Sequence, residues 1–517
     1  MNTRADKIMH YAAYIYIVLP FLIFVIGWMR WYYALALSTI IIISFILSIK
    51  NINQFIKIDF NKNKNKLIIA LSAILLWVFF SGIGGYSYQN EDHHYRNAIL
   101  RDLITYDWPV VYHVEGLKNG NIIDGQSCLM VYYLGYWLPA ALIGKVFGWV
   151  AANFFLYIWS VSGVLLIYYF FCRKFNKFSL KLLWIFIFFG NLYYIGCFFH
   201  FPFRTVLEKD YVLWADGLTI SSSTTGTFYW VFNQFVPPVL IILLILNNIH
   251  KKNILFIYSF CFFFGPLSFI GLFPYILYIM IQNIFFNTEN KDNLLNKILN
   301  YISFQNIIAG LLIVSITFFY FSSNSAVSHI SIFQPTSIES YLIFTLLSYS
   351  LLFAFLYKKY KTEPLFYISF IILTFLPFLE INKPYNDFSA RGSIPSMIIL
   401  MYLTGKMIIE NNGKYRKLYL VSTYLIIAAI GTGLQISRSV LFTTGNYFFH
   451  DKASIYLYGR NNIFGLRENL GKNPNASKNR NNLIQDDLKT LNNPNNFAIN
   501  NFMGLTSKSI FYKYLAK

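Results

Sequence analysis

Residues Tyr11 to Trp28 read YAAYIYIVLPFLIFVIGW, and residues Leu418 to Gln435 read LYLVSTYLIIAAIGTGLQ. A helix needs about 20 predominantly apolar residues to cross roughly 30 Å of hydrocarbon. Neither stretch contains a charged residue, and neither alternates between apolar and polar residues as a barrel strand does. Because backbone polar groups in lipid are satisfied only within helices or closed barrels, both stretches predict membrane-spanning helices.

The composition of the whole chain agrees with these two stretches. Of its 517 residues, 12% are charged and 56% are hydrophobic, whereas a soluble domain is about 25% charged. The sequence therefore predicts an all-α integral membrane protein with about thirteen transmembrane helices, large outer loops and interfacial helices. The predicted spans are 9–28, 32–49, 67–83, 150–171, 182–199, 228–247, 254–270, 271–286, 303–321, 339–357, 364–379, 393–410 and 417–437. The break between the seventh and eighth spans is placed on Pro266, Gly271 and Pro274.

The formal net charge is +20, but the basic residues are distributed as short clusters between apolar spans. A nucleic-acid-binding protein gathers such residues on one water-facing surface, so no nucleic-acid partner is expected. Basic clusters between spans instead mark cytoplasmic loops. They predict a multi-pass protein of the plasma (inner) membrane with a cytoplasmic N-terminus and an extracytoplasmic C-terminus. The clusters include Lys62, Lys64 and Lys66; Arg173, Lys174, Lys177 and Lys181; Lys251 and Lys252; and Lys358, Lys359 and Lys361.

Residues 129–147 are apolar enough to span, yet a crossing there would place Arg173 and every later basic cluster outside. A helix lying in the outer interface restores the alternation, and its aromatic residues Tyr132, Tyr133, Tyr136 and Trp137 suit that depth. The chain then divides into a transmembrane domain, 1–437, and a polar extracytoplasmic tail, 438–517. The domain includes a first large outer loop, 84–149, with interfacial helices.

The first outer loop contains a dense cluster of ionisable side chains. It presents an acidic pair, two imidazoles, two arginines and a further carboxylate, in the order Glu91, Asp92, His93, His94, Arg96, Arg101 and Asp102. Ionised groups so close to a membrane helix are costly unless they are paired or used. Carboxylates beside imidazoles can act as a general base or hold a divalent cation. The alternative is an ordinary polar loop in which the arginines neutralise the acids.

Two later outer segments add polar groups. Asn233 and Gln234 stand just before Pro237 and Pro238, where amides can bind sugar hydroxyls or satisfy carbonyls that the prolines free. The segment 380–392 ends with Arg391, which opens a predicted transmembrane helix from the outside. Its guanidinium can bind a phosphate, or it can extend to lipid headgroups.

This layout resembles the GT-C superfamily of polytopic glycosyltransferases, which includes the protein O-mannosyltransferases and the aminoarabinose transferase of lipid A. The resemblance covers roughly residues 60–435 and rests on an acidic pair early in the first large loop, Glu91-Asp92, and a late arginine, Arg391. The stretches Gln89–Pro109 and Asn386–Pro395 also look like those of uncharacterised bacterial membrane proteins grouped with this superfamily.

The resemblance implies an inverting transfer of a sugar from a polyprenyl-phosphate-linked donor to an extracytoplasmic glycan, lipid or protein acceptor. It implies Glu91, Asp92 and Asp102 as catalytic residues, and Arg391 and Arg96 as ligands of the donor phosphate. The implied substrate-binding residues are His93, His94, Asn233, Gln234, Asn386 and Asp387. No cofactor is certain, although Glu91, Asp92 and His93 would be the ligands if Mg²⁺ or Mn²⁺ takes part. The alternatives are a lipid-linked saccharide flippase or other transporter, and a non-catalytic envelope assembly protein.

Overall fold

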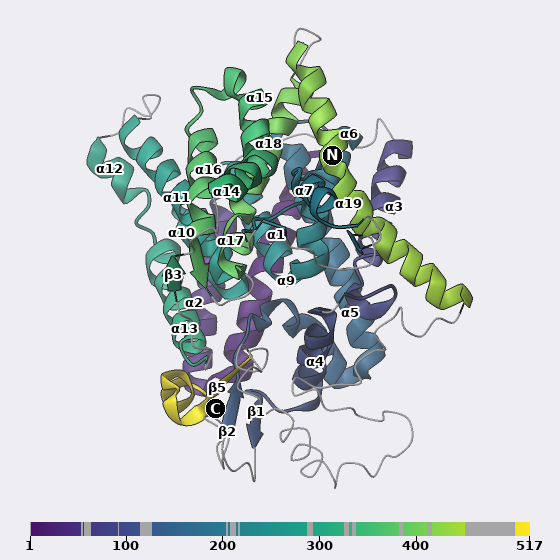
Figure 1. The fold of residues 1–517 in the computed structure, drawn as a ribbon. Coiled ribbons are helices and arrows are strands. Elements are labelled where there is room, and N and C mark those ends of the chain that lie inside the picture. The colour runs from purple at the N-terminus through teal and green to yellow at the C-terminus, as the bar shows by residue number, and fades with distance from the viewer. Residues whose placement is uncertain are drawn as a thin grey trace.

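The structure is a computed structural model. It describes residues 2–52, 55, 64–90, 92–113, 127–202, 205–206, 214–215, 218–286, 293–324, 330–332, 338–381, 386–410, 416–449 and 502–517. These residues are mostly helical, with a few short strands (Figure 1). The α-helices are α1 Asn2–Trp28, α2 Trp31–Lys50, α3 Lys64–Phe79, α4 Asp92–Thr105, α5 Leu138–Lys174, α6 Leu180–Phe188, α7 Tyr193–His200, α9 Thr224–Leu246, α10 Ile254–Phe264, α11 Pro266–Ile281, α12 Leu294–Leu299, α13 Gly310–Phe321, α14 Ile338–Thr345, α15 Leu351–Tyr360, α16 Pro364–Phe375, α17 Asp387–Gly392, α18 Ile394–Ile409 and α19 Arg416–Phe449. The strands are β1 Val111–His113, β2 Ser127–Met130, β3 Ile330–Ile332, β4 Leu379–Ile381 and β5 Met503–Leu505.

Within the described part of the chain, eight helical segments are long and apolar enough to cross a membrane. They are Arg4–Trp28, Trp31–Lys50, Leu138–Lys174, Thr224–Leu246, Pro266–Phe286, Ile338–Tyr360, Asp387–Ile409 and Leu418–Gly445. Large apolar side chains are exposed on several of them; Leu35 is 64% exposed and Ile426 is 73% exposed. Because water does not tolerate so much exposed apolar surface on a monomer, these faces fit contact with lipid. The predicted class, an all-α multi-pass membrane protein, is confirmed; the number of thirteen spans stays a prediction.

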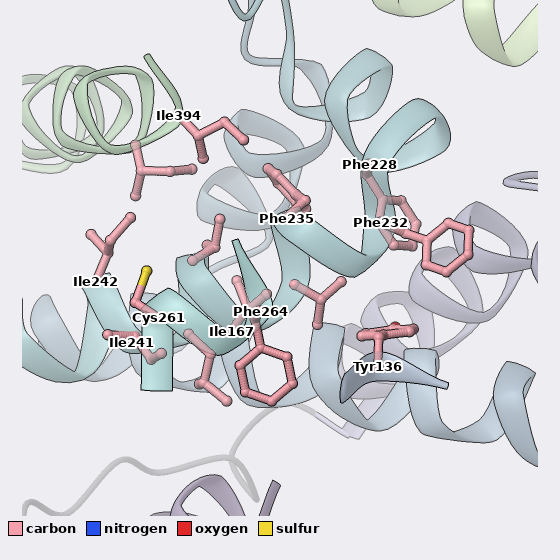
Figure 2. Close-up of a cluster of buried hydrophobic side chains, with 14 of the residues drawn as sticks. Tyr136, Ile167, Phe228, Phe232, Phe235, Ile241, Ile242, Cys261, Phe264 and Ile394 are labelled. Carbon is pink, nitrogen blue, oxygen red and sulfur yellow. The ribbon is translucent and has the colours of Figure 1, made fainter. Parts of the chain in front are cut away.

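Helix α9 forms the centre of the bundle, and nearly all of its residues are buried. Its aromatic and aliphatic side chains meet Ile167 of α5, Phe264 of α10 and Ile394 of α18 in one cluster (Figure 2). The helix is interrupted at Val231, which has φ −137° and ψ 45°. Pro237 and Pro238 lie beyond this break, inside the continuing helix. The distortion therefore falls before the prolines, and Asn233 and Gln234 begin the second part of the helix.

Basic ends of several helices meet at one end of the bundle. Arg173, at the end of α5, donates from Nε to Asp6 Oδ1 of α1 at 2.9 Å and from Nη1 to Asn247 Oδ1, just after α9, at 3.2 Å. Asn51, after α2, donates to Asn253, the residue before α10, at 3.1 Å. Loops that the charge pattern assigned to one compartment are thus neighbours in space.

The opposite end carries the first outer loop and the last residues of the chain. Strands β1, β2 and β5 form an antiparallel sheet in that order, with Cys128 opposite Tyr112 on one side and Leu505 on the other. Arg30, between α1 and α2, donates to the carbonyl of Ala516 at 3.0 Å. The two termini therefore lie toward opposite ends of the bundle (Figure 1).

Several predicted boundaries were wrong. The predicted span 182–199 is two short helices, α6 and α7, separated by an extended stretch in which Gly190 forms a bridge to Ser223. The turn between α10 and α11 lies at Gly265, since Gly271 and Pro274 are inside α11. Helix α19 continues to Phe449, so the proposed boundary at 438 falls within a helix.

The segment 129–147 is only partly helical. It begins in β2, passes through the short 3₁₀ turn Leu134–Tyr136 and enters α5 at Leu138. At Gly148 the backbone has φ 84°, a conformation that glycine adopts readily, and the helix turns sharply. A Cβ placed on Gly144 would lie 2.9 Å from Cβ of Ala152, so the two arms of α5 fold closely together. The first arm packs beside α4, where Lys145 Nζ donates to the carbonyl of Tyr106 at 2.6 Å.

Candidate functional site

Helix α4 begins at Asp92, which forms an ion pair with Arg96 one helical turn later. Arg96 Nη2 lies 2.6 Å from Asp92 Oδ2. Residues four apart lie on one helix face, which allows this pairing. The Arg96 side chain is 5% exposed and that of Asp92 is 40% exposed. The arginine is therefore buried beneath a carboxylate that solvent reaches.

The ring of Phe232 supports this part of α4. The Arg96 guanidinium carbon lies 5.0 Å from the centroid of the Phe232 ring, and the His93 ring centroid lies 5.8 Å from it. Phe232 belongs to the apolar cluster around α9, where Tyr136 packs beside it at 5.3 Å (Figure 2). A cation over an aromatic face gains about 0.5–2 kcal/mol, more when water is excluded. The core of the bundle thus fixes the position of a buried positive charge.

Helix α17 contains a second ion pair with the same spacing. Arg391 Nη2 lies 3.1 Å from Asp387 Oδ1, again one turn apart. Asn386 caps this helix by accepting from the Ser389 amide at 3.1 Å, and its Nδ2 donates to the carbonyl of Pro377. Asn386 therefore caps α17, and its role in substrate binding stays a prediction. Arg391 lies in the last turn of α17, just before α18, and does not begin the long helix as predicted.

Helix α11 holds α17 at a very short distance. Ser268 donates to the carbonyl of Arg391 at 3.2 Å. A Cβ placed on Gly271 would lie 2.0 Å from the carbonyl oxygen of Gly392. A glycine at this position is therefore what allows the backbone that carries Arg391 to approach α11.

The two pairs are close enough to act on each other, together with Tyr132 and Tyr133. Burial raises the pKa of Tyr132 well above its ordinary value, and the nearby charges of Arg391 and Arg96 act in the opposite direction. Burial also raises the pKa of Tyr133, and Arg391 again opposes the shift. Asp92 also interacts electrostatically with both Asp387 and Arg391. Residues far apart in the sequence therefore form one charged cluster, which we call the Arg96–Arg391 cluster and which comprises Asp92, Arg96, Tyr132, Tyr133, Asp387 and Arg391.

A cavity of about 320 Å³ adjoins this cluster. Tyr132 and Tyr133 form part of its wall, and the other lining residues come from the region of β2, α10, α11 and α13. These are Val131, Phe262, Pro266, Phe318, Phe321, Ser322 and Asn324. Most of these side chains are apolar, so the cavity suits a hydrophobic group attached to a polar one.

Other predicted site residues lie elsewhere or outside the described residues. Asp102 is buried and accepts a hydrogen bond from the Tyr112 hydroxyl at 2.6 Å, which ties α4 to β1. Asn233 and Gln234 are buried in α9, and their side-chain amides have no hydrogen-bond partner among the residues that the structure describes. Glu91 and the side chain of His94 lie outside the described residues.

The described residues contain no group of three His, Cys, Asp or Glu side chains able to hold a metal ion. The predicted set of Glu91, Asp92 and His93 includes one residue that is not described, so it stays a prediction. The chemistry that the described residues do offer is two guanidinium groups, two carboxylates, two phenols and an imidazole.

Sequence reasoning missed three contributors to this site. Tyr132 and Tyr133 were interpreted only as interfacial aromatics, although their position opposite Arg391 depends on the path of β2. Phe502, near the end of the predicted tail, stacks on Tyr95 of α4 at 5.5 Å and packs on Tyr132 at 4.6 Å. No local sequence pattern predicts these contacts, because they join residues that lie far apart in the sequence.

Comparisons with models of protein families, with curated proteins and with solved structures give no match.

Proposed function

We propose that the protein is a membrane glycosyltransferase that takes a sugar from a polyprenyl-phosphate-linked donor and transfers it to an extracytoplasmic glycan, lipid or protein acceptor. The observation that supports the proposal is that two ion pairs, one from α4 and one from α17, lie near each other beside Tyr132 and Tyr133. Each carboxylate holds its arginine in one orientation, which prepares both guanidinium groups before a ligand arrives.

Two arginines near each other, Arg96 buried and Arg391 16% exposed, favour an anion between them. Burial lowers the pKa of Arg96, Asp92 opposes that effect, and the charge of Arg391 lowers the pKa further. Nη1 of Arg96 is buried and has no hydrogen-bond partner in the part of the chain that the structure describes. A phosphate would relieve the repulsion between the two arginines and accept a hydrogen bond from Arg96 Nη1. A phosphate is also the anionic group that a polyprenyl-linked donor carries.

The cavity behind Tyr132 and Tyr133 suits the lipid part of such a donor. Phe262, Phe318 and Phe321 give it an apolar wall, and burying prenyl carbons there would gain about 25 cal/mol per Å² of apolar surface. The phosphate would then lie at the polar edge of the cavity, next to Arg391. This arrangement separates a lipid chain from the sugar that it carries.

The arrangement in the membrane is part of the proposal. We assign the end that carries Arg173 and Lys174 to the cytoplasm and the end that carries α4 and β5 to the outside, according to the positive charge of the former. A count of about thirteen crossings requires α3, α10, α13, α16 and the α6–α7 pair to cross together with the eight longer segments.

In the proposed reaction, the acceptor hydroxyl attacks the anomeric carbon of the sugar. The bond between that carbon and the phosphate oxygen breaks, and its electron pair leaves on the polyprenyl phosphate. Arg96 and Arg391 stabilise the developing negative charge, which is the kind of electrostatic assistance that contributes most to such transfers. A base on α4 takes the hydroxyl proton; Asp92 and His93 stand next to each other there.

Exchange of Arg391 for lysine tests the proposal. Arg391→Lys keeps the positive charge but loses the planar fork that binds two phosphate oxygens. We expect kcat/KM for a defined polyprenyl-phosphate donor to fall about ten- to a hundredfold, the worth of one charge-assisted contact. Lys359→Arg is the matched control. Lys359 lies on another part of the surface, where its Nζ is 3.3 Å from Oε2 of Glu410.

Two results would count against this function, and one would discredit the assay. Equal kcat/KM in Arg391→Lys and wild type would remove Arg391 from donor binding, since a lysine satisfies lipid headgroups equally well. A similar loss in Lys359→Arg would mean that the assay reports general damage. Binding of the donor by wild type without any transfer would favour a transporter of lipid-linked saccharides.

A further inference from the structure

The orientation of His93 is fixed by a short chain of hydrogen bonds. Asn90 Nδ2 donates to the carbonyl of Tyr229 in α9 at 3.2 Å, so the Asn90 amide oxygen is directed to its other neighbour. That neighbour is Nδ1 of His93, which lies 2.9 Å from Asn90 Oδ1. Because an amide oxygen only accepts, Nδ1 must carry the hydrogen. The backbone of α9 therefore selects one tautomer of His93.

The other ring nitrogen is left as an acceptor. With the hydrogen on Nδ1, Nε2 of the neutral ring presents a lone pair. The His93 side chain is buried, with 1% of its surface exposed. Its Nε2 has no hydrogen-bond partner among the residues that the structure describes.

We infer that His93 Nε2 is the group that accepts the proton of the acceptor hydroxyl. The inference rests on the proposed function. The hydroxyl proton passes to Nε2 as the acceptor oxygen forms its bond to the anomeric carbon. The electron pair of the breaking carbon–oxygen bond leaves on the polyprenyl phosphate. The positive charge gained by the imidazole is then next to the departing phosphate, which Arg96 and Arg391 already attract.

Asp92 fits this role less well than His93. Asp92 Oδ2 lies 2.6 Å from Arg96 Nη2, and this contact orients the arginine that the phosphate requires. Protonation of Asp92 during the reaction would weaken that contact at the moment when Arg96 is needed. His93 has no such second duty, since its Nδ1 bond to Asn90 persists when the ring becomes protonated.

The tautomer can be measured without any transfer assay. Nitrogen NMR of the protein in detergent, labelled with ¹⁵N-histidine, should show His93 as a neutral ring protonated at Nδ1. The His93→Gln variant identifies its signals among those of the eight histidines. Asn90→Leu removes the acceptor of the Nδ1 hydrogen and should shift the population toward the Nε2-protonated form. A wild-type ring protonated at Nε2 would overturn the inference and leave the proposed function untouched.

Kinetics then separate a base from a binding residue. His93→Gln retains a hydrogen-bond acceptor but cannot take the proton, so kcat should fall about 10²-fold or more while KM changes little. Asp92→Asn should lose less kcat than His93→Gln. His250→Gln, at the basic end near α10, is the matched control and should transfer at the wild-type rate.

The opposite ranking would overturn the inference. Full kcat in His93→Gln with a severe loss in Asp92→Asn would make the carboxylate the base. Thermal unfolding of each variant excludes misfolding as the cause, because an unfolded His93→Gln would show a lowered Tm. No transfer by wild type would remove the proposed function, and the NMR result would still decide the tautomer.

Discussion

At the scale of single residues, the position of Arg391 depends on a glycine that carries no chemistry. Gly271 of α11 faces Gly392, and an added Cβ would lie 2.0 Å from that residue's carbonyl oxygen. Backbone cannot move aside as a side-chain tip can, so α17 must shift. Displacements of about 1 Å at a reacting centre can cost about 10²-fold in rate. Arg391 belongs to α17 and would move with it.

We therefore expect Gly271→Ala to lower sugar transfer by about 10²-fold and to cost about 1–3 kcal/mol of stability, as overpacking does. Initial rates with a defined donor and thermal unfolding in detergent give the two values. Gly433→Ala in α19 is the control, because a Cβ there meets no atom within 4 Å. A fully active Gly271→Ala would show that α17 adjusts without moving the guanidinium of Arg391.

At the scale of elements, the last sixteen residues of the chain, 502–517, are integrated into the fold. Strand β5 extends the sheet of the first outer loop, and Phe511 packs on Phe24 of α1 and Tyr320 of α13. Phe502 covers Tyr95 and Tyr132 beside the Arg96–Arg391 cluster. This segment therefore supports one wall of the candidate site.

Displacement of β5 should loosen that wall. A Cβ on Gly504 would lie 1.7 Å from the carbonyl oxygen of Ser323, so Gly504→Ala cannot keep the observed pairing. We expect a stability loss of about 1–3 kcal/mol and faster proteolysis within 502–517. Mass spectrometry of limited digests measures the latter. Gly445→Ala, where a Cβ meets nothing within 4 Å, should digest like wild type; equal digestion of both variants would disprove the strand's role.

A second element-scale contact joins α1 to α5. Asp6 is fully buried; it accepts from Arg173 Nε at 2.9 Å and from the Tyr169 hydroxyl at 2.5 Å. Removal of one partner of a buried ion pair leaves an uncompensated charge. We expect Asp6→Asn to cost about 3–5 kcal/mol of unfolding free energy.

Chemical or thermal unfolding in detergent measures this loss. The exposed pair of Lys359 and Glu410 is the comparison, and Glu410→Gln should cost at most about 1 kcal/mol. Equal losses in Asp6→Asn and Glu410→Gln would mean that the Asp6 pair is as well solvated as a surface pair.

These elements also show what a sequence can and cannot predict. The predicted span 32–49 matches α2 to one residue at each end, because hydrophobic length identifies a spanning helix. The spans 9–28 and 417–437 lie within α1 and α19, which both continue beyond their apolar runs. The α6–α7 break was missed because Gly190 pairs with Ser223, the residue before α9, and no local sequence pattern reveals that contact. Asp92 and Arg391 were selected from their place beside the membrane. Phe232 and Tyr132 were not selected for the site, since their roles arise only when α9 and β2 meet α4.

At the scale of the whole molecule, contacts between distant segments gather at two opposite ends of the bundle. Contacts among Arg173, Asp6 and Asn247 gather at one end, and α4, β2 and β5 gather at the other (Figure 1). Since β5 pairs with β2, the end of the chain lies on the same side as the first outer loop. The break at Gly148 lets the first arm of α5 stay on that side, next to α4, before the second arm crosses. This grouping of helix ends is consistent with the proposed arrangement of sides.

Cysteine labelling in intact cells tests this arrangement. Cys128, Cys172, Cys197 and Cys261 are all buried, so a membrane-impermeant thiol reagent should leave them unlabelled in the folded protein. We expect Ser507→Cys, on the exposed part of the C-terminal segment, to be labelled from outside. Lys181→Cys, at the start of α6, should be labelled only after the cells are permeabilised. Labelling of Lys181→Cys in intact cells would mean that residues 129–147 cross the membrane, and every later loop would then change sides. The Arg96–Arg391 cluster could not then face a donor outside the cell as a single site, because α4 and α17 would be assigned to opposite compartments.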